Sequence, residues 1–155
     1  MRVEVGMMQK DNFSIRQANF DDVEALVKID LECFSSPWSE ISFKNEMAHD
    51  YAICYVVCYN QDVVGYINAR KIFDEISINN VAVAKKYRRM GIGEMLINHL
   101  FSNISDDILS LTLEVRESNI PAQNLYSKCG YEKIGVRRNF YDKPTENAIL
   151  MTRYI

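Results

Sequence analysis

The sequence lacks any apolar run of the roughly 18 residues that a membrane-spanning helix requires. It opens without a signal-peptide pattern, and it contains no internal repeat or low-complexity segment. Basic residues are not in excess, because 18 Lys and Arg stand against 21 Asp and Glu, a formal net charge of -3. This balance argues against general nucleic-acid binding. We expect a cytoplasmic protein with neither nucleic acid nor membrane among its partners.

Metal-binding patterns are also missing, and we expect no metal. The cysteines form no CxxC pair and no spacing typical of zinc, although there are four: Cys33, Cys54, Cys58 and Cys129. Cys54 and Cys58 lie four apart in an apolar stretch and therefore on one face of a strand. Buried thiols in a reducing compartment are the favoured interpretation. No motif links His49 or His99 to Cys129 as a base, so a packed thiol is favoured there over an acyl nucleophile.

Length and composition fit one globular domain, since 155 residues with 48% hydrophobic content can bury a sizeable core. Residues 1–12 show no periodicity and are predicted to form a loosely ordered extension before a single domain at 13–155. Period-two patterns predict strands at 13–17, 51–59, 63–71, 76–83, 108–115, 131–138 and 147–154. Caps and helical periodicity predict helices at 19–33, 39–48, 94–103 and 119–129. This order indicates an α/β (α+β) fold, with a mixed sheet of about seven strands flanked by about four helices.

The most informative segment follows the predicted strand at 76–83. Four of the five residues from Lys85 to Arg89 are basic, and Gly91 and Gly93 come next, at the start of a predicted helix. Glycines let backbone N–H groups approach a ligand closely, and the helix N-terminus and arginines add positive charge. The segment therefore predicts a site for a phosphate-bearing cofactor, with a solvated surface turn as the alternative.

The spacing of this segment distinguishes between phosphate-binding loops. A dinucleotide loop would need a third glycine where Leu96 stands, and a P-loop would need a lysine directly after Gly93. What remains is Arg88-x-x-Gly91-x-Gly93, which resembles the signature of the GNAT family of N-acetyltransferases. In that family the loop wraps the pyrophosphate of acetyl-CoA. The resemblance therefore implies the GNAT fold and acetyl-CoA as cosubstrate.

Candidate chemistry lies further along the chain. Glu114 projects near the end of a predicted strand, where open α/β sheets bind ligands and where a carboxylate is costly to bury without a purpose. A solvated carboxylate, or one paired with Arg116, is the alternative. Asn119 and Tyr126 are seven residues apart and share one face of the predicted helix. A simple helix cap and a simple packing residue are the alternatives for these two.

These residues belong to longer motifs. Glu114-Val115-Arg116-x-Ser118-Asn119 is followed by Leu125-Tyr126, by Cys129-Gly130-Tyr131 and by the segment 137–141, and Phe34–Ser39 precedes them. Together they resemble the bacterial ribosomal-protein-alanine N-acetyltransferases, a GNAT subfamily, from about residue 13 to residue 151. Two departures stand out: Ala84-Lys85-Lys86 occupies a turn that often contains proline, and Asn147 replaces an aspartate.

The resemblance implies a role for each matching position. Glu114 would be the general base and Tyr126 the general acid. The implied cofactor-binding residues are Val81, Ala82, Val83, Arg88, Arg89, Met90, Gly91, Ile92, Gly93, Glu94, Asn119 and Tyr126. The interpreted acceptor-binding residues are Phe34, Trp38, Glu75 and Tyr141. A hydrophobic staple remains the alternative for Trp38, and a solvated strand end for Glu75.

The implied reaction is direct attack by a protein N-terminal amine, most closely the N-terminal alanine of a small-subunit ribosomal protein, on the acetyl thioester. Deprotonation at pH 7 costs about 1 kcal/mol for an α-amino group with pKa ~7.8, whereas it costs nearly 5 kcal/mol for a lysine with pKa ~10.4. A single carboxylate base suits the first task better. Acetylation of lysine or of a small amine remains an alternative, as does a non-catalytic acyl-CoA-binding module.

Overall fold

The computed structural model describes residues 12–155, so nearly all of the predicted extension lies outside the described residues. Seven strands form one mixed sheet in the order β1-β2-β3-β4-β5-β7-β6, and four α-helices accompany it within the described part, which confirms the predicted fold class. The strands are β1 (Phe13–Gln17), β2 (Ala52–Tyr59), β3 (Asp62–Ile72), β4 (Glu75–Val83), β5 (Ser110–Arg116), β6 (Glu132–Tyr141) and β7 (Glu146–Tyr154). The helices are α2 (Val23–Cys33), α3 (Glu40–Met47), α4 (Ile92–Ser102) and α5 (Ile120–Lys128).

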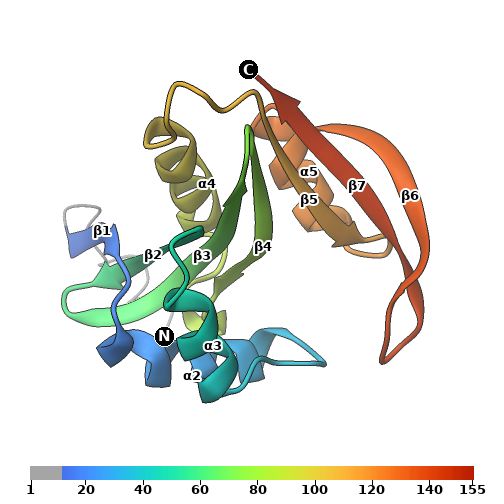
Figure 1. Ribbon diagram of the computed structural model, residues 1–155. Coiled ribbons are helices and arrows are strands. Elements are labelled where there is room, and N and C mark those ends of the chain that lie inside the picture. Colours follow the sequence, from blue (N-terminus) through green and yellow to red (C-terminus); the bar gives the residue numbers. More distant parts are fainter. Residues whose placement is uncertain (1–11) are drawn as a thin grey trace.

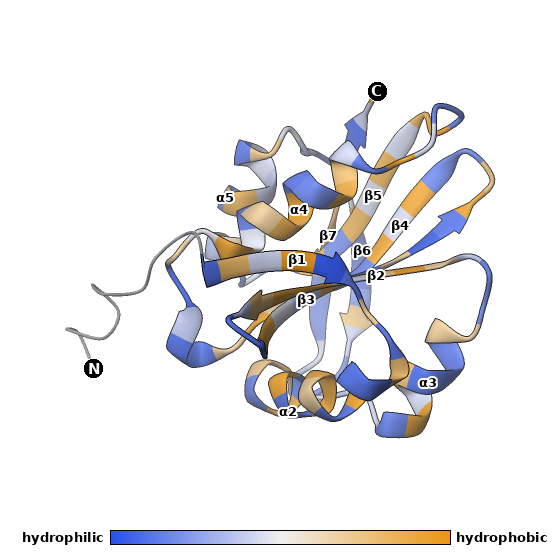
Figure 2. Cartoon of the chain, turned by 90° about the vertical axis from the view of Figure 1, so that its left-hand side faces the viewer, coloured by the Kyte–Doolittle hydropathy of each residue, from blue (hydrophilic) through white to orange (hydrophobic). Residues whose placement is uncertain are grey.

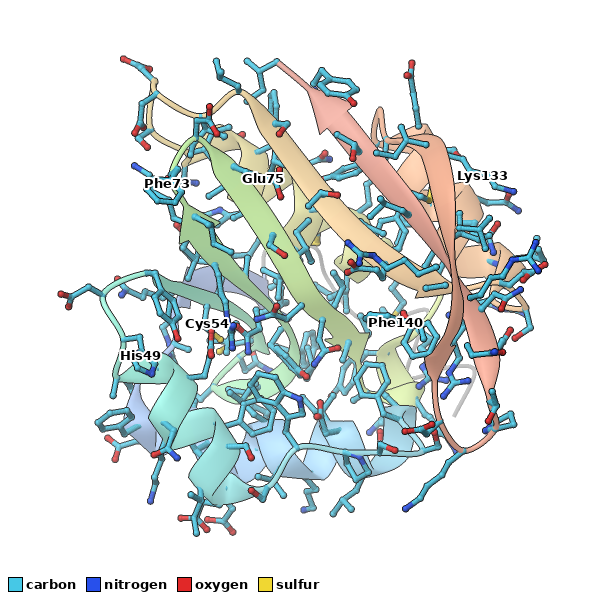
Figure 3. The ribbon with its side chains drawn as sticks, turned by 45° about the vertical axis from the view of Figure 1, so that its right-hand side comes forward. His49, Cys54, Phe73, Glu75, Lys133 and Phe140 are labelled. Atoms are coloured by element: carbon cyan, nitrogen blue, oxygen red, sulfur yellow. The ribbon has the colours of Figure 1, made fainter. Side chains whose placement is uncertain are left out.

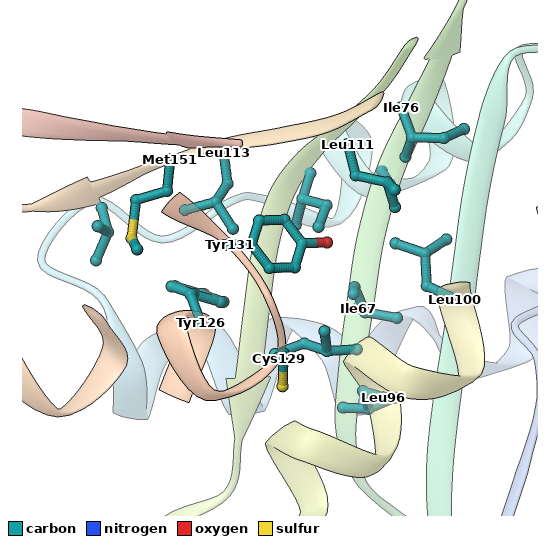
Figure 4. Packing of buried hydrophobic residues seen from close by; sticks show 14 of the residues in the cluster. Ile67, Ile76, Leu96, Leu100, Leu111, Leu113, Tyr126, Cys129, Tyr131 and Met151 are labelled. Atoms are coloured by element: carbon teal, nitrogen blue, oxygen red, sulfur yellow. The ribbon is translucent and has the colours of Figure 1, made fainter. Parts of the chain in front are cut away.

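The helices cover both faces of the sheet and bury two separate cores (Figure 1). One core lies between the sheet and α4 with α5, and Figure 4 shows Leu96, Leu113 and Met151 within it. The other lies between the sheet and α2 with α3, around Leu26 and Phe43. Hydrophobic and hydrophilic residues alternate along α2 and α4, as expected of helices that bury one side (Figure 2). Among residues 12–155 no helix is both long and apolar enough to cross a bilayer.

One pair of strands organises the site. Among the strands of residues 12–155, β4 and β5 are the only parallel neighbours, and their pairing runs from Glu75 with Ser110 to Ile78 with Leu113. β4 continues to Val83 and β5 to Arg116 without pairing further, so the two strands spread apart at their carboxyl ends (Figure 1). An opening of this kind in an open α/β sheet is a usual place for a ligand.

β4 also contains an irregularity just where it leaves β5. Its register with β3 pairs Asn80 with Asn68 and Ile78 with Ala69, so Asn79 is an extra residue on β4. Such a bulge bends and twists the strand that carries it. It therefore lies where the separation of β4 from β5 begins.

Candidate active site

The helix that follows the opening, α4, starts at a glycine. α3 and α5 begin with side-chain caps, because Ser39 accepts from the N–H of Ser42 and Asn119 from that of Ala122. α4 begins at Gly91, which has φ 80 and ψ 11 and forms no side-chain cap. The first N–H groups of this helix therefore point outward without an intrahelical partner, together with the positive end of the helix dipole. This arrangement suits an anion.

A cavity of about 650 Å³ lies between this helix start, the end of β4 and α5. All but one of the predicted cofactor-binding residues line it, and Met90 instead packs, partly buried, against the core beside α4. Five further lining residues were not predicted as site residues: Cys33, Tyr87, Pro121, Ala122 and Leu125. Apolar side chains on one side and free N–H groups with arginines on the other fit a long ligand that carries a diphosphate at one end.

Gly93 lies in close contact with α5. A Cβ placed there would lie 3.1 Å from Cδ2 of Leu125, so any larger residue would require the Leu125 side chain to shift by a few tenths of an ångström. Gly91 has a different reason, because no heavy atom lies within 4 Å of its missing Cβ and only its positive φ favours glycine. The two glycines of the signature therefore serve packing and backbone conformation respectively.

Tyr126 lies on α5, is 8% exposed and lines this cavity. Figure 4 shows it among apolar side chains from α4 and the sheet. Burial raises the pKa of Tyr126, with smaller contributions from Tyr141 and Cys129. The phenol is therefore protonated at neutral pH and has a proton to donate.

A second cavity of about 220 Å³ adjoins the first, since Cys33 and Asn119 line both. Three of the predicted acceptor-binding residues line it: Phe34, Trp38 and Tyr141. The remaining lining residues are Asp30, Ser35, Ser36, Asn80 and Arg116. Trp38 also packs on Phe43 with ring centroids 5.3 Å apart, so it both forms the staple contact and lines the cavity. Asn119, likewise, caps α5 and lines both cavities.

The wall of the second cavity contains a buried carboxylate. Asp30 is fully buried, and it accepts hydrogen bonds from the hydroxyl of Tyr66 and from the backbone N–H of Trp38, the latter at 3.0 Å. Burial raises the pKa of Asp30, although both hydrogen bonds oppose that change. The contact to Trp38 ties the α2–α3 loop to α2, and the contact to Tyr66 ties Asp30 to β3 of the sheet. The loop carries two of the cavity's aromatic residues, Phe34 and Trp38.

Glu114 is placed less directly than the sequence suggested. It is not among the residues that line either cavity of the described chain. Its Oε1 lies 3.2 Å from Nε of Arg137, whereas Arg116 pairs with Glu146, so the alternative pairing of Glu114 with Arg116 is wrong. Arg137 lies on β6 and β7 lies between β6 and β5, so the contact between Arg137 and Glu114 crosses β7. Burial, and then the charge of Glu114, raise the pKa of Tyr141, which lines the second cavity, to about 12.

Two other predictions need correction. Glu75 begins β4, at the end of the strand remote from both cavities, and Figure 3 shows it near Phe73 and away from Phe140. The structure does not bring it together with the other acceptor-binding candidates. Cys33 is only half-buried and lines both cavities, whereas Cys54, Cys58 and Cys129 are buried as predicted. Among residues 12–155 no group of three or more His, Cys, Asp or Glu is arranged to hold a metal.

Comparison with known proteins identifies the fold around these cavities. The model of the acetyltransferase (GNAT) family matches residues 23–131. The chain belongs to the GNAT family of acetyltransferases. A curated relative, the [ribosomal protein bS18]-alanine N-acetyltransferase of Haemophilus influenzae, is 32% identical over 91% of this chain and 98% of its own length.

Solved structures agree with this GNAT assignment. The crystal structure of the ribosomal-protein-S18-alanine N-acetyltransferase from Escherichia coli superposes with a TM-score of 0.86 at 29% identity, covering 92% of this chain and 94% of the other. Arabidopsis thaliana NAA60 in complex with acetyl-CoA superposes with a TM-score of 0.84 at 19% identity, covering 92% and 99%. The second likeness is one of fold alone.

Proposed function

We propose that this GNAT acetyltransferase transfers an acetyl group from acetyl-CoA to the N-terminal α-amino group of a protein, with the N-terminal alanine of a small-subunit ribosomal protein as acceptor. The observation that carries the proposal is the pair of adjoining cavities that share Cys33 and Asn119 at the opening between β4 and β5. Two substrates held there at once are close enough to react directly. The named activity of relatives that match nearly the whole chain supports the choice of acceptor.

The residues of the larger cavity fit acetyl-CoA. The uncapped start of α4, with Arg88 and Arg89 beside it, would hold the pyrophosphate. The end of β4 from Val81 to Val83 has no strand partner on its β5 side, so its backbone groups are available to the amides of the pantetheine arm. The GNAT structure from Arabidopsis thaliana with acetyl-CoA bound supports the same choice of donor at the level of the fold.

Proton transfer is assigned to two side chains. Glu114 would take the proton of the acceptor ammonium, directly or through a water, and would have to exchange its contact with Arg137 to do so. Tyr126 remains protonated because its pKa is raised, and it would donate its hydroxyl proton toward the departing sulfur. An N-terminal amine needs only the modest help that one carboxylate supplies, which favours it over lysine.

A pair of matched peptides tests the proposal. The purified full chain is mixed with acetyl-CoA and an alanine-starting peptide that carries an internal lysine, and the products are sequenced by mass spectrometry. The control is the same peptide with its N-terminus blocked. We expect one acetyl group on the first peptide, at its N-terminus, and none on the blocked peptide. Acetylation of the lysine in the blocked peptide would contradict the choice of acceptor, and absence of thiol release with either peptide would refute the proposal.

A further inference from the structure

Arg116 ends β5 in the wall of the smaller cavity and holds the β6–β7 hairpin. Its Nη2 donates to the carbonyl of Asp142 at 2.7 Å, and its Nη1 donates to the carbonyl of Pro144 and to Oε1 of Glu146, each at 3.0 Å. Its guanidinium plane also lies over the ring of Tyr141, 4.5 Å from the centroid. A single side chain therefore holds the turn of the hairpin and the aromatic ring that the hairpin contributes to the cavity.

Arg116 also reaches the opposite wall. Its Nη2 lies 3.5 Å from Oγ of Ser35, in the α2–α3 loop that carries Phe34 and Trp38. The aromatic residues of the two walls come from segments more than 100 residues apart in the chain, and Arg116 contacts both segments. The separation of the walls, and so the width of the cavity, depends on this side chain.

The ion pair at the centre of this arrangement is only partly exposed to water. The side chains of Arg116 and Glu146 are 25% and 17% exposed. Glu146 also accepts the backbone N–H of Ser118 at 2.5 Å, and the hydrogen bonds from Ser118 and Arg116 hold the pKa of Glu146 below its usual value. The carboxylate of Glu146 is therefore charged at neutral pH, and the pair ties the start of β7 to the turn after β5.

The geometry requires arginine. Two nitrogens of one planar group serve three oxygens of the hairpin while the plane stacks on Tyr141. Lysine carries a single nitrogen on a flexible stem and can neither span these acceptors nor stack in the same way. An Arg116→Lys variant therefore keeps the charge but loses the geometry.

We propose that Arg116, paired with Glu146, is a positioning residue that sets the width of the acceptor cavity and thereby selects the first side chain of the acceptor. The inference rests on the proposed function, because it concerns the peptide N-terminus that the smaller cavity would admit. It assigns Arg116 to acceptor binding and selectivity. The residue lines only the smaller cavity, so donor binding is left to the other one.

The test compares Arg116→Lys with the wild type on two peptides that differ only in an alanine or a leucine as first residue. Loss of one or two charge-assisted hydrogen bonds predicts a KM for the alanine peptide that rises at least about tenfold. The ratio of kcat/KM between the alanine and leucine peptides should fall, whereas the Kd of acetyl-CoA should stay within about twofold. A merely destabilised protein would lose activity on both peptides equally, so the ratio separates positioning from stability.

Arg138→Lys is the matched control, since Arg138 is an exposed arginine of β6. This variant should leave KM, the kcat/KM ratio between the two peptides and the Kd of acetyl-CoA unchanged. If Arg116→Lys fails to fold, Glu146→Gln weakens the same pair and should reduce selectivity in the same direction. Folded variants with wild-type KM and selectivity would overturn the inference alone. If the wild type transfers acetyl to neither peptide, the proposed function and this inference are both refuted.

Discussion

Gly91→Ala isolates the backbone requirement of the phosphate-binding loop. Gly91 is in the left-handed region at φ 80, and no heavy atom lies within 4 Å of the position that a Cβ would take. The substitution therefore creates no clash, and its cost is conformational, about 1–2 kcal/mol for an L-residue in that region. We expect the free energy of unfolding to fall by about 1 kcal/mol or more, and Tm by roughly 2–4 °C for each kcal/mol.

The same strain should weaken donor binding. If the loop relieves it by rotating at Gly91, the N–H groups that begin α4 turn away from the cavity, and the affinity for acetyl-CoA should fall by about tenfold, equivalent to 1.4 kcal/mol. Thermal unfolding and calorimetric titration with acetyl-CoA measure the two effects. Gly91→Asn is the control, because asparagine tolerates the left-handed region. This variant should retain more of the stability and more of the affinity for acetyl-CoA than the alanine variant. An alanine variant that matches the wild type in Tm and Kd would refute the reasoning.

Three further predictions concern protons. Glu114→Gln should lower kcat by about 100-fold or more while leaving the Kd of acetyl-CoA unchanged, and an unaltered kcat would exclude Glu114 as the base. With an alanine-starting peptide, kcat/KM should rise with pH to a plateau above about 7.8, where the α-amino group is neutral. It should not fall before about pH 10, because the raised pKa of Tyr126 keeps the phenol protonated. Tyr126→Phe should lower the plateau. The hydrogen bond from Arg16 lowers the pKa of Asp22, so this pair stabilises the fold above roughly pH 4 and the contribution is lost as pH falls through the lowered pKa. Urea unfolding of Asp22→Asn should therefore show a loss of stability at neutral pH that shrinks toward about pH 2.

Elements with a local chemical signal were predictable from the sequence. The strand at Phe13–Gln17 has the predicted bounds, and the helices after Ser39 and Asn119 begin where those caps indicate. The loop after β4 was recognisable because charge, glycine and helix periodicity follow one another directly in the chain. Each of these signals depends on residues within a few positions of one another, so it can be recognised without knowledge of the tertiary fold.

The unpredicted features depend on contacts between distant elements. Cys33 lines both cavities because the end of α2 lies against the end of β4, where its sulfur is 3.4 Å from the carbonyl oxygen of Val83 and 3.2 Å from Nη2 of Arg88. Leu125 lines the larger cavity, where its Cδ2 would lie 3.1 Å from a Cβ placed on Gly93 of α4. The pairing of Glu114 with Arg137 was not predicted, because it depends on the register of β5, β7 and β6.

The two departures from the family pattern acquire a structural account. Lys85 stands in the turn that often contains proline, and its backbone N–H, which proline would lack, donates to Oε2 of Glu32 at 3.0 Å. Oδ1 of Asn147 accepts the N–H of Asn139 at 3.0 Å, where β6 turns through a positive φ. An amide oxygen accepts this bond as a carboxylate oxygen would, so the substitution removes a charge and keeps the contact.

The bulge in β4 joins the fold to the site. Ile76 and Ile78 belong to the core beside α4, and strict alternation would also send Asn80 to that core. The extra residue Asn79 inverts the alternation, so Val81 and Val83 pack toward α4 while Asn80 faces the smaller cavity. Without the bulge, a polar amide would be buried among the aliphatic side chains, and the smaller cavity would lose one of its polar lining residues. Because the same bulge lies where β4 separates from β5, the irregularity that opens the sheet also orients the residues that line the opening.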